Sequence, residues 1–452
     1  MHWTYGIALM FGGIIVLMGF GIPVAFAFLL LDLIGVYLFM GGVRGFGQLI
    51  NNAFSSLTLF SLAPVPLFLL MGELFFHTGL AVRVFDGFDK LLGRVPARLS
   101  VITVVSGTTF AALSGSSLAN TALMGSLMVP EMTKRGYKPS LSVGPIMGAG
   151  GLAILIPPSA LAVLLGTIAQ IDIGNLLIAG IGPGLVLAVL YLVVIFIINW
   201  LDPNAAPRYE VPRVGMAEKL RALVLDILPM SFIVFNVIGL MLLGWATPTE
   251  AAAFGAVAVV ILAFLYRCMS WKALVRALTG SLRVTVMAFM IILASATFSQ
   301  ILAFSGTSGG LIKWALSFDL PGWAIILVMF GVLLILGCFM ESLSILLLTV
   351  PVFFPLAKEL GFDLIWFGVI VMMSLEIGFT TPPFGMLLFV MKGVAPPGTT
   401  MGQIIGAALP FLACAMITVA LIAIFPGIRT LNQSSARRII FRNRKPHRRA
   451  IR

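Results

Sequence analysis

Two stretches of the sequence combine hydroxyl groups, small residues and paired prolines in a pattern that suits cation binding. The run SGSSLANTAL at 114–123 offers hydroxyl, amide and backbone oxygens, and the run GGLAILIPPS at 150–159 ends close to a proline pair. Two consecutive prolines remove two backbone N–H donors and clash with the preceding turn. We therefore expect the helix to break near Pro157 and to free carbonyl oxygens, which attract a cation.

A second pair of stretches repeats this arrangement later in the chain. The run GCFMES spans 337–342, and TTPP at 380–383 ends another apolar segment. Glu341 lies in the first run, and Glu376 lies just before the second. Ionisable residues inside membrane segments are costly and usually functional, although Glu376 is equally well explained as a partner for backbone groups freed by the break.

Oxygen ligands of this kind suit a hard cation such as Na⁺, and an anionic substrate is favoured beside the first run because that run carries no acid. The predicted Na⁺ ligands are Ser114, Ser116, Ile154, Leu155, Pro157, Gly337, Met340, Glu341, Thr380, Thr381 and Pro382. The predicted substrate-binding residues are Ser114, Gly115, Ser116, Ser117, Asn120, Pro158, Ser159 and Pro383. Na⁺ is predicted as a coupling ion, and no cofactor is predicted.

The composition places these stretches in a membrane protein. The chain has 452 residues, of which 60% are hydrophobic and 10% are charged, against roughly 25% charged in soluble domains. This composition excludes soluble and nucleic-acid-binding classes, and apolar runs of about 20 residues recur along the chain. Much of the net charge of +12 comes from a basic tail at 429–452, which holds nine Lys and Arg and no acid.

The sequence repeats itself at a shift of 225 residues. Prolines coincide at this shift in four places: Pro23 with Pro248, Pro96 with Pro321, Pro130 with Pro355 and Pro157-Pro158 with Pro382-Pro383. Each copy has five predicted crossings, an odd number, so the second copy is expected to be inverted, as in secondary transporters. We therefore predict an all-α polytopic membrane protein of two inverted five-helix repeats, each with a re-entrant hairpin and a Pro-Pro-broken helix.

The predicted boundaries follow from this repeat. The first repeat covers 1–201, with a hairpin at 97–131 and a broken helix at 139–175; a cytoplasmic linker at 202–222 leads to the second repeat at 223–428, with a hairpin at 321–356 and a broken helix at 363–393. Further helices are predicted at 5–20, 23–40, 57–78, 176–201, 223–243, 247–266, 284–304 and 403–426, with amphipathic arms at 43–56 and 268–282. Lys and Arg gather in the loops of one side, which puts the N-terminus outside.

These stretches resemble the large membrane subunit of TRAP (tripartite ATP-independent periplasmic) transporters, the DctM type. The resemblance rests on 114–140 and 150–159, with GPGL at 182–185, TPTEAAAFGA at 247–256 and EIGFTTPPFGMLLFV at 376–390, and it covers about 1–428. It implies the elevator-type architecture of the ion-transporter superfamily and a multi-pass, Na⁺-coupled importer of an organic acid in the bacterial inner membrane. It also implies two partners, a small four-helix membrane subunit (DctQ type) and a periplasmic substrate-binding protein (DctP type).

Three other functions fit parts of the sequence. A proton-coupled transporter of the same architecture would use Glu341 or Glu376 as the proton carrier. An intramembrane hydrolase with Ser116 as nucleophile would need a general base within reach, and His77 is the only histidine outside the chain ends. A channel gains nothing from two inverted hairpins. The sequence thus predicts a transporter that contacts lipid and binds no nucleic acid, and it does not predict an enzyme.

Overall fold

The computed structural model describes residues 3–207 and 214–424, and every regular element in these two stretches is helical. The first half contains α1 (Trp3–Ile7), η1 (Ala8–Gly12), α2 (Gly13–Gly19), α3 (Val24–Phe39), α4 (Val43–Leu57), η2 (Phe60–Leu62), α5 (Pro64–His77), α6 (Leu80–Leu91), α7 (Arg98–Ser114), α8 (Ser117–Lys134), α9 (Pro139–Ser142), α10 (Gly144–Leu155), α11 (Ala160–Ile168) and α12 (Ile173–Leu201). The predicted basic tail at 429–452 lies outside the described residues.

The second half has a similar order of elements. It contains η3 (Pro203–Ala205), α13 (Met216–Ala222), η4 (Leu223–Ile227), α14 (Leu228–Leu242), α15 (Pro248–Leu265), α16 (Trp271–Phe304), α17 (Thr307–Leu316), α18 (Gly322–Phe339), α19 (Ser342–Glu359), α20 (Leu364–Thr380), α21 (Met386–Val394) and α22 (Met401–Ile424). Of the linker predicted at 202–222, η3 and α13 are described, and residues 208–213 lie outside the described part.

The helices confirm an all-α polytopic membrane protein. Within the two described stretches, eight helices are long and apolar enough to cross a membrane, and a ninth span results if the bent pair Pro139–Leu155 and Ala160–Ile168 counts as one. Three of the ten predicted crossings contain shorter apolar helices, Trp3–Gly19, Val24–Phe39 and Leu364–Thr380. The count of ten crossings therefore stays a prediction.

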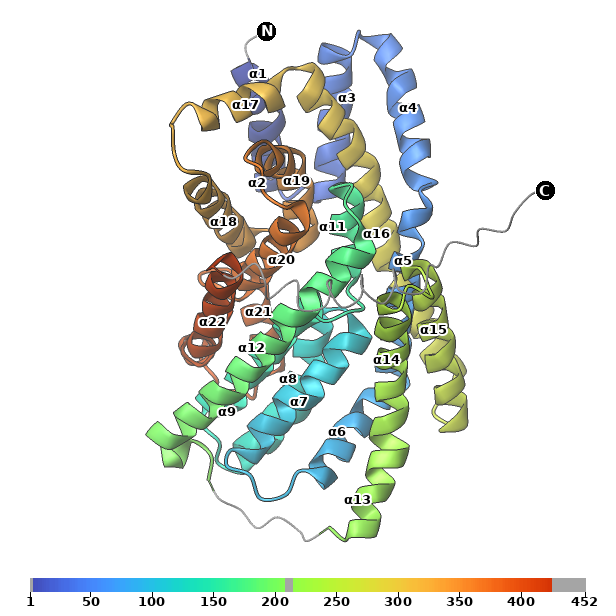
Figure 1. Cartoon of the computed structure of the whole chain (residues 1–452), viewed down its shortest axis with the longest axis vertical. Helices are drawn as coiled ribbons and strands as arrows, with labels where there is room; N and C mark the ends of the chain where they lie inside the picture. Colours follow the sequence, from blue (N-terminus) through green and yellow to red (C-terminus); the bar gives the residue numbers. More distant parts are fainter. Residues whose placement is uncertain (1–2, 208–213, 425–452) are drawn as a thin grey trace, which may run out of the picture.

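The two hairpins occupy opposite halves of the molecule. Figure 1 shows α7 and α8 in the lower half of the view and α18 and α19 in the upper half, with α20 between them. The second limb of each hairpin begins at equivalent positions, Ser117 and Ser342, which are 225 residues apart. The inverted relation of the two repeats stays a prediction, and this arrangement is compatible with it.

The structure corrects several predicted element boundaries. The arm predicted at 268–282 and the helix predicted at 284–304 form one helix, α16, because no proline interrupts Trp271–Phe304. In the first half Pro64 begins a new helix, α5, and so separates it from α4; proline fits the first turn of a helix but not its interior.

Other corrections concern short or capped elements. Helices α6 and α17 were not predicted, because they are 12 and 10 residues long and lie in the connections before the hairpins. The first broken helix ends at Ile168 instead of residue 175, because Asp172 caps the start of α12 by accepting a hydrogen bond from Asn175 N at 2.6 Å. The second limbs of the hairpins continue past 131 and 356, to Lys134 and Glu359.

Candidate cation and substrate site

The first hairpin turns at a glycine that lies against the first helix break. Gly115 follows α7 with a positive φ of 60°, a conformation that residues with a Cβ rarely adopt. A Cβ on Gly115 would lie 3.0 Å from the carbonyl oxygen of Pro158. The tip and the break that were predicted to form one site are therefore in direct contact. Ser114 ends α7, and its side chain lies outside the described part of the chain.

Two serine hydroxyls beside this contact cap the helices that begin there. Ser116 Oγ accepts a hydrogen bond from Ala119 N, and Ser159 Oγ accepts one from Ala162 N, both at 3.3 Å. Such N-cap bonds satisfy backbone donors that have no partner within the helix. Both serines thus stand at the N-termini of helices, α8 and α11, where the helix dipole favours an anionic group.

The carbonyl groups freed at the first break do not all face the tip. The Pro157-Pro158 peptide bond is cis, and α10 ends two residues before it, at Leu155. A Cβ on Gly180 of α12 would lie 2.5 Å from the Leu155 carbonyl oxygen, so this carbonyl faces α12. Ile154 is buried in the last turn of α10. The Pro158 carbonyl is the one that approaches the tip.

Three buried oxygen atoms belong to side chains that contact the consecutive residues 149–151 of α10, behind the first tip. Asn120 Nδ2 donates to the carbonyl oxygen of Ala149 at 2.9 Å, and its Oδ1 has no partner among the described residues. Thr121 Oγ1 and Glu376 Oε1 are likewise unpartnered within the described chain. Cβ atoms on the two glycines of this stretch would lie 2.2 Å from Thr121 Oγ1 and 2.9 Å from Glu376 Oε1. Buried polar atoms of this kind call for a water or an ion.

Glu376 reaches from α20 to the first hairpin. Its Oε2 accepts a hydrogen bond from Ser117 Oγ at 2.9 Å, and only 7% of the residue is exposed. A cavity of about 20 Å³ lies beside it, between α10, α12, α20 and α22, and its lining includes Tyr191 and Thr380. This volume exceeds the roughly 10–15 Å³ that one water molecule needs.

The second hairpin packs on the second break through glycine backbones. A Cβ on Gly337 would lie 2.7 Å from the Cα of Gly378, so α18 and α20 touch without intervening side chains. Next to this contact, Cys338 Sγ donates to the carbonyl oxygen of Pro382 at 3.7 Å. The predicted second tip and second break are therefore adjacent, as the first pair is.

The remaining residues of the predicted second site lie around this contact. The hydroxyls of Thr380 and Thr381 donate to the carbonyls of Glu376 and Ile377 at 3.1 and 2.6 Å. Met340 follows α18, the Pro382-Pro383 bond is cis, and Glu341 precedes α19 without a side-chain bond to the start of that helix. A carboxylate at this position favours a cation and disfavours an anionic substrate.

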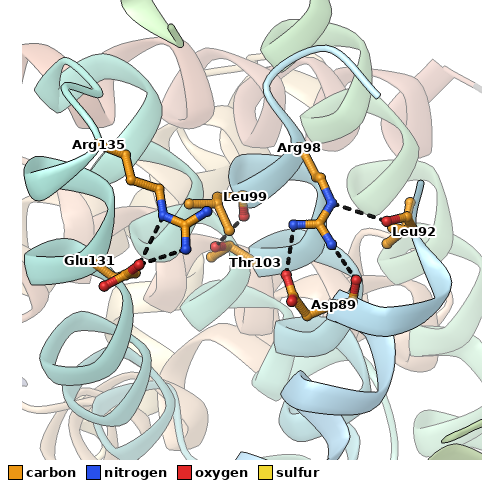
Figure 2. A network of polar contacts seen from close by, with 7 residues as sticks. All are labelled: Asp89, Leu92, Arg98, Leu99, Thr103, Glu131 and Arg135. Carbon is orange, nitrogen blue, oxygen red and sulfur yellow. Dashed lines mark hydrogen bonds and ion pairs between the residues drawn. The ribbon is translucent and has the colours of Figure 1, made fainter. Parts of the chain in front are cut away.

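At the opposite end from its tip, the first hairpin is held by the guanidinium group of Arg98. Figure 2 shows Arg98, the first residue of α7, between Asp89 and Leu92. Its Nη1 lies 2.8 Å from Asp89 Oδ1, its Nε donates to Leu92 O at 3.0 Å, and its Nη2 donates to Asp89 O. The same figure shows the exposed pair Arg135 and Glu131 at the end of α8, 2.7 Å apart. The base of the hairpin is thus tied to α6 by a buried arginine.

A further ion pair joins the start of α9 to the end of α12. Lys138 Nζ lies 2.5 Å from Asp202 Oδ2, just beyond the end of α12. The hydrogen bond from Lys138 lowers the pKa of the Asp202 carboxyl below its ordinary value of 3.8.

Thr121 and Tyr191 stand at this site without having been predicted from the sequence. Thr121 lies one helical turn after Ser117, so the two share one face of α8. That spacing was a usable signal in the run SGSSLANTAL. Tyr191 belongs to the apolar helix α12 and is 3% exposed, and no local pattern sets it apart.

Comparisons with known proteins give one consistent result. The family model described as "Tripartite ATP-independent periplasmic transporter, DctM component" matches residues 11–428. The chain is similar to the C4-dicarboxylate TRAP transporter large permease protein DctM of Pseudomonas aeruginosa, with 35% identity over 82% of this chain and 85% of that protein. It is also similar to the isethionate TRAP transporter permease protein DctMQ of Oleidesulfovibrio alaskensis, with 30% identity over 83% of this chain and 58% of that protein.

A solved structure shares the fold. The YdaH transporter of Alcanivorax borkumensis aligns with a TM-score of 0.58 and 14% identity, over 86% of this chain and 90% of that chain. At this identity the match bears on the fold alone.

Proposed function

Because the chain belongs to the DctM family of tripartite ATP-independent periplasmic transporters, we propose that it imports an organic acid into the bacterial cell and that Na⁺ drives this import. The family is one of transporter permeases, not of enzymes. The histidine that a hydrolase would need, His77, pairs with Glu73 of its own helix at 3.2 Å. In the proposed function the chain lies in the inner membrane, works with a small membrane subunit, and takes its substrate from a periplasmic binding protein.

One observation carries the proposal for Na⁺. Buried oxygens of Asn120, Thr121 and Glu376 are unpartnered within the described chain, and the three side chains contact consecutive residues of α10 behind the first tip. An all-oxygen set with a carboxylate suits a hard cation better than a transition metal. The described residues also contain no group of three or more His, Cys, Asp or Glu that could hold such a metal. The predicted ligands at the second break supply hydroxyl and carbonyl oxygens of the same kind.

The substrate side of the proposal rests on charge. The first tip has no acid in its own run and stands at two helix N-termini, which favour a carboxylate group, whereas the second tip carries Glu341. The acid that reaches the first tip, Glu376 of α20, bonds Ser117. We therefore place the substrate carboxylate beside Gly115 and Ser116, because the Ser117 hydroxyl already donates to Glu376. In an elevator mechanism, the hairpins and broken helices at 97–175 and 321–393 would move together against the remaining helices and the arms.

The DctMQ relative is longer than this chain, and a membrane partner fused to the permease would account for its extra length.

The test uses the chain reconstituted in liposomes with both partners. Uptake of a C4-dicarboxylate, the substrate class named for one relative, is measured with an inward Na⁺ gradient and with choline in place of Na⁺ at constant potential. We expect uptake only with Na⁺. Equal uptake in choline would refute Na⁺ coupling, and uptake that then follows a proton gradient would establish the proton-coupled alternative.

Two variants test the site assignment in the same assay. Glu341→Gln is expected to weaken the Na⁺ dependence and to leave the half-saturating concentration of loaded binding protein nearly unchanged. Ser116→Ala is expected to weaken both. Glu359→Gln is the matched control, because Glu359 is an exposed acid at the other end of α19. If Glu341→Gln has the same Na⁺ dependence as Glu359→Gln and Ser116→Ala changes neither quantity, the site assignment is wrong, although the family assignment is unaffected.

A further inference from the structure

One residue of α20 contacts both proposed cation regions. The Glu376 carboxylate accepts a hydrogen bond from Ser117, the first residue of α8 behind the first tip, at 2.9 Å and across 259 residues of sequence. Its backbone carbonyl accepts a hydrogen bond from Thr380, the last residue of α20 before the second break, at 3.1 Å. The first tip and the second break are therefore joined through a single residue.

The packing around Glu376 leaves its side chain little room to move. Glu376, Ser117 and Thr380 are all buried, with at most 8% exposed. A Cβ on Gly151 of α10 would lie 2.8 Å from Glu376 Cγ, so the backbone of α10 lies directly against the carboxylate. A buried hydrogen bond is costly to leave unmade. A displacement of the first tip must therefore either break this bond or move α20 with it.

The two copies of the repeat differ in this contact, which the first tip makes and the second tip does not make among the described residues. At the shift of 225 residues Glu376 corresponds to Gly151, so the glycine of the first copy provides the space that the glutamate of the second copy fills. Ser117 corresponds to Ser342, whose buried hydroxyl has no partner among the residues described. The second tip thus lacks the bond that the first tip makes.

We infer that Glu376 is a positioning residue that couples the two proposed cation regions, so that closure of the first tip on Na⁺ also orders the second break. This inference rests on the proposed function. Two sites that share a two-state element bind cooperatively, and the coupling is reciprocal. The link needs an acceptor oxygen at position 376 and a donor at position 117, but it does not need the negative charge.

The test measures equilibrium binding of radioactive Na⁺ to the purified full-length chain, with choline chloride holding the ionic strength constant. The wild type is expected to bind with a Hill coefficient above 1. Ser117→Ala and Glu376→Leu are expected to lower it towards about 1. Glu376→Gln removes a charge from the proposed oxygen set and is expected to weaken Na⁺ binding, but it keeps an acceptor for Ser117 and is expected to retain a Hill coefficient above 1. Ser374→Ala is the control, because among the described residues this buried hydroxyl of α20 bonds only Ile370 of its own helix.

A second measurement does not depend on Na⁺. A double-mutant cycle of thermal stability for positions 117 and 376 is expected to show non-additivity, and the same cycle for positions 342 and 376 is expected to be additive. If Glu376→Leu folds poorly, Glu376→Ala takes its place in the cycle with Ser117→Ala, because it also removes the acceptor.

The outcomes separate the inference from the function on which it rests. A wild type that binds no Na⁺ overturns the proposed coupling ion and the inference with it. Cooperative Na⁺ binding that Ser117→Ala leaves unchanged, as Ser374→Ala does, overturns the inference alone. A Hill coefficient of about 1 for Glu376→Gln also overturns it, because an acceptor oxygen at position 376 would then not be enough to maintain the link.

Discussion

Replacement of Arg98 by alanine is expected to destabilise the chain far more than replacement of Arg135 by alanine. The Arg98 side chain is 6% exposed, and it serves the Asp89 carboxylate and two backbone carbonyls. A hydrogen bond to a charged group contributes about 1.5–3 kcal/mol when it is buried. Because Asp89 is 41% exposed, water replaces part of its contribution, and we expect a loss of about 3 kcal/mol in the free energy of unfolding.

Arg135 provides the matched control. Its partner Glu131 lies one helical turn away, and the two side chains are 36% and 44% exposed. Exposed pairs at this spacing contribute about 0.3–0.5 kcal/mol. Asp89→Ala is expected to fall between the two, because it removes the carboxylate and leaves both carbonyl acceptors of Arg98 in place.

The assay is denaturant unfolding in detergent micelles, followed by circular dichroism, for the three variants and the wild type. The expected order of destabilisation is Arg98→Ala, then Asp89→Ala, then Arg135→Ala. An Arg98→Ala variant as stable as Arg135→Ala would show that the base of the hairpin does not depend on the buried guanidinium. Equal losses for Arg98→Ala and Asp89→Ala would instead assign the whole effect to the ion pair.

Three further predictions follow from contacts described above. Because the pKa of Asp202 is lowered in the folded chain, its contribution to stability is present above its ordinary value of 3.8 and is lost as the pH falls through the folded value; Asp202→Asn should therefore flatten the acid end of the stability profile, and an unchanged profile would contradict this. Gly337→Ala should abolish uptake because its methyl group would meet backbone, whereas Gly331→Ala on the same helix meets nothing within 4 Å among the described residues and should be neutral; equal uptake by both would argue against the close contact. Cysteines at Met216 and Gly309 in a cysteine-free background should react with membrane-impermeant reagents from opposite sides, inside and outside, and labelling from one side would reject the inverted topology.

Local covalent chemistry made part of the site predictable. A proline pair cannot continue a helix wherever it occurs, so the breaks beside Leu155 and at Thr381 were expected and are found. Small and polar residues in the middle of apolar runs predicted the hairpin turns. The turns at Gly115 and Met340 fall inside the predicted runs 114–123 and 337–342.

Contacts between distant segments could not be predicted in the same way. The Ser117–Glu376 bond joins residues 259 positions apart, and it depends on the room that a glycine of α10 leaves. The direction of the Leu155 carbonyl is set by the approach of α12, again at a glycine, Gly180. These contacts and orientations depend on how the helices pack against one another, and no residue spacing within a single sequence predicts that packing.

The uninterrupted α16 makes the two halves of the molecule differ in stiffness. A helix of 34 residues is about 51 Å long at 1.5 Å per residue, whereas the hydrocarbon core of a bilayer is about 30 Å thick. The equivalent part of the first half is divided between α4 and α5 by the short turn η2. A flexed joint at η2 need not break any bond inside a helix, whereas a bend in α16 must break bonds of its i to i−4 ladder. A displacement at one end of α16 therefore moves its other end as well. A displacement of α4, in contrast, changes the backbone angles at η2 and does not have to move α5.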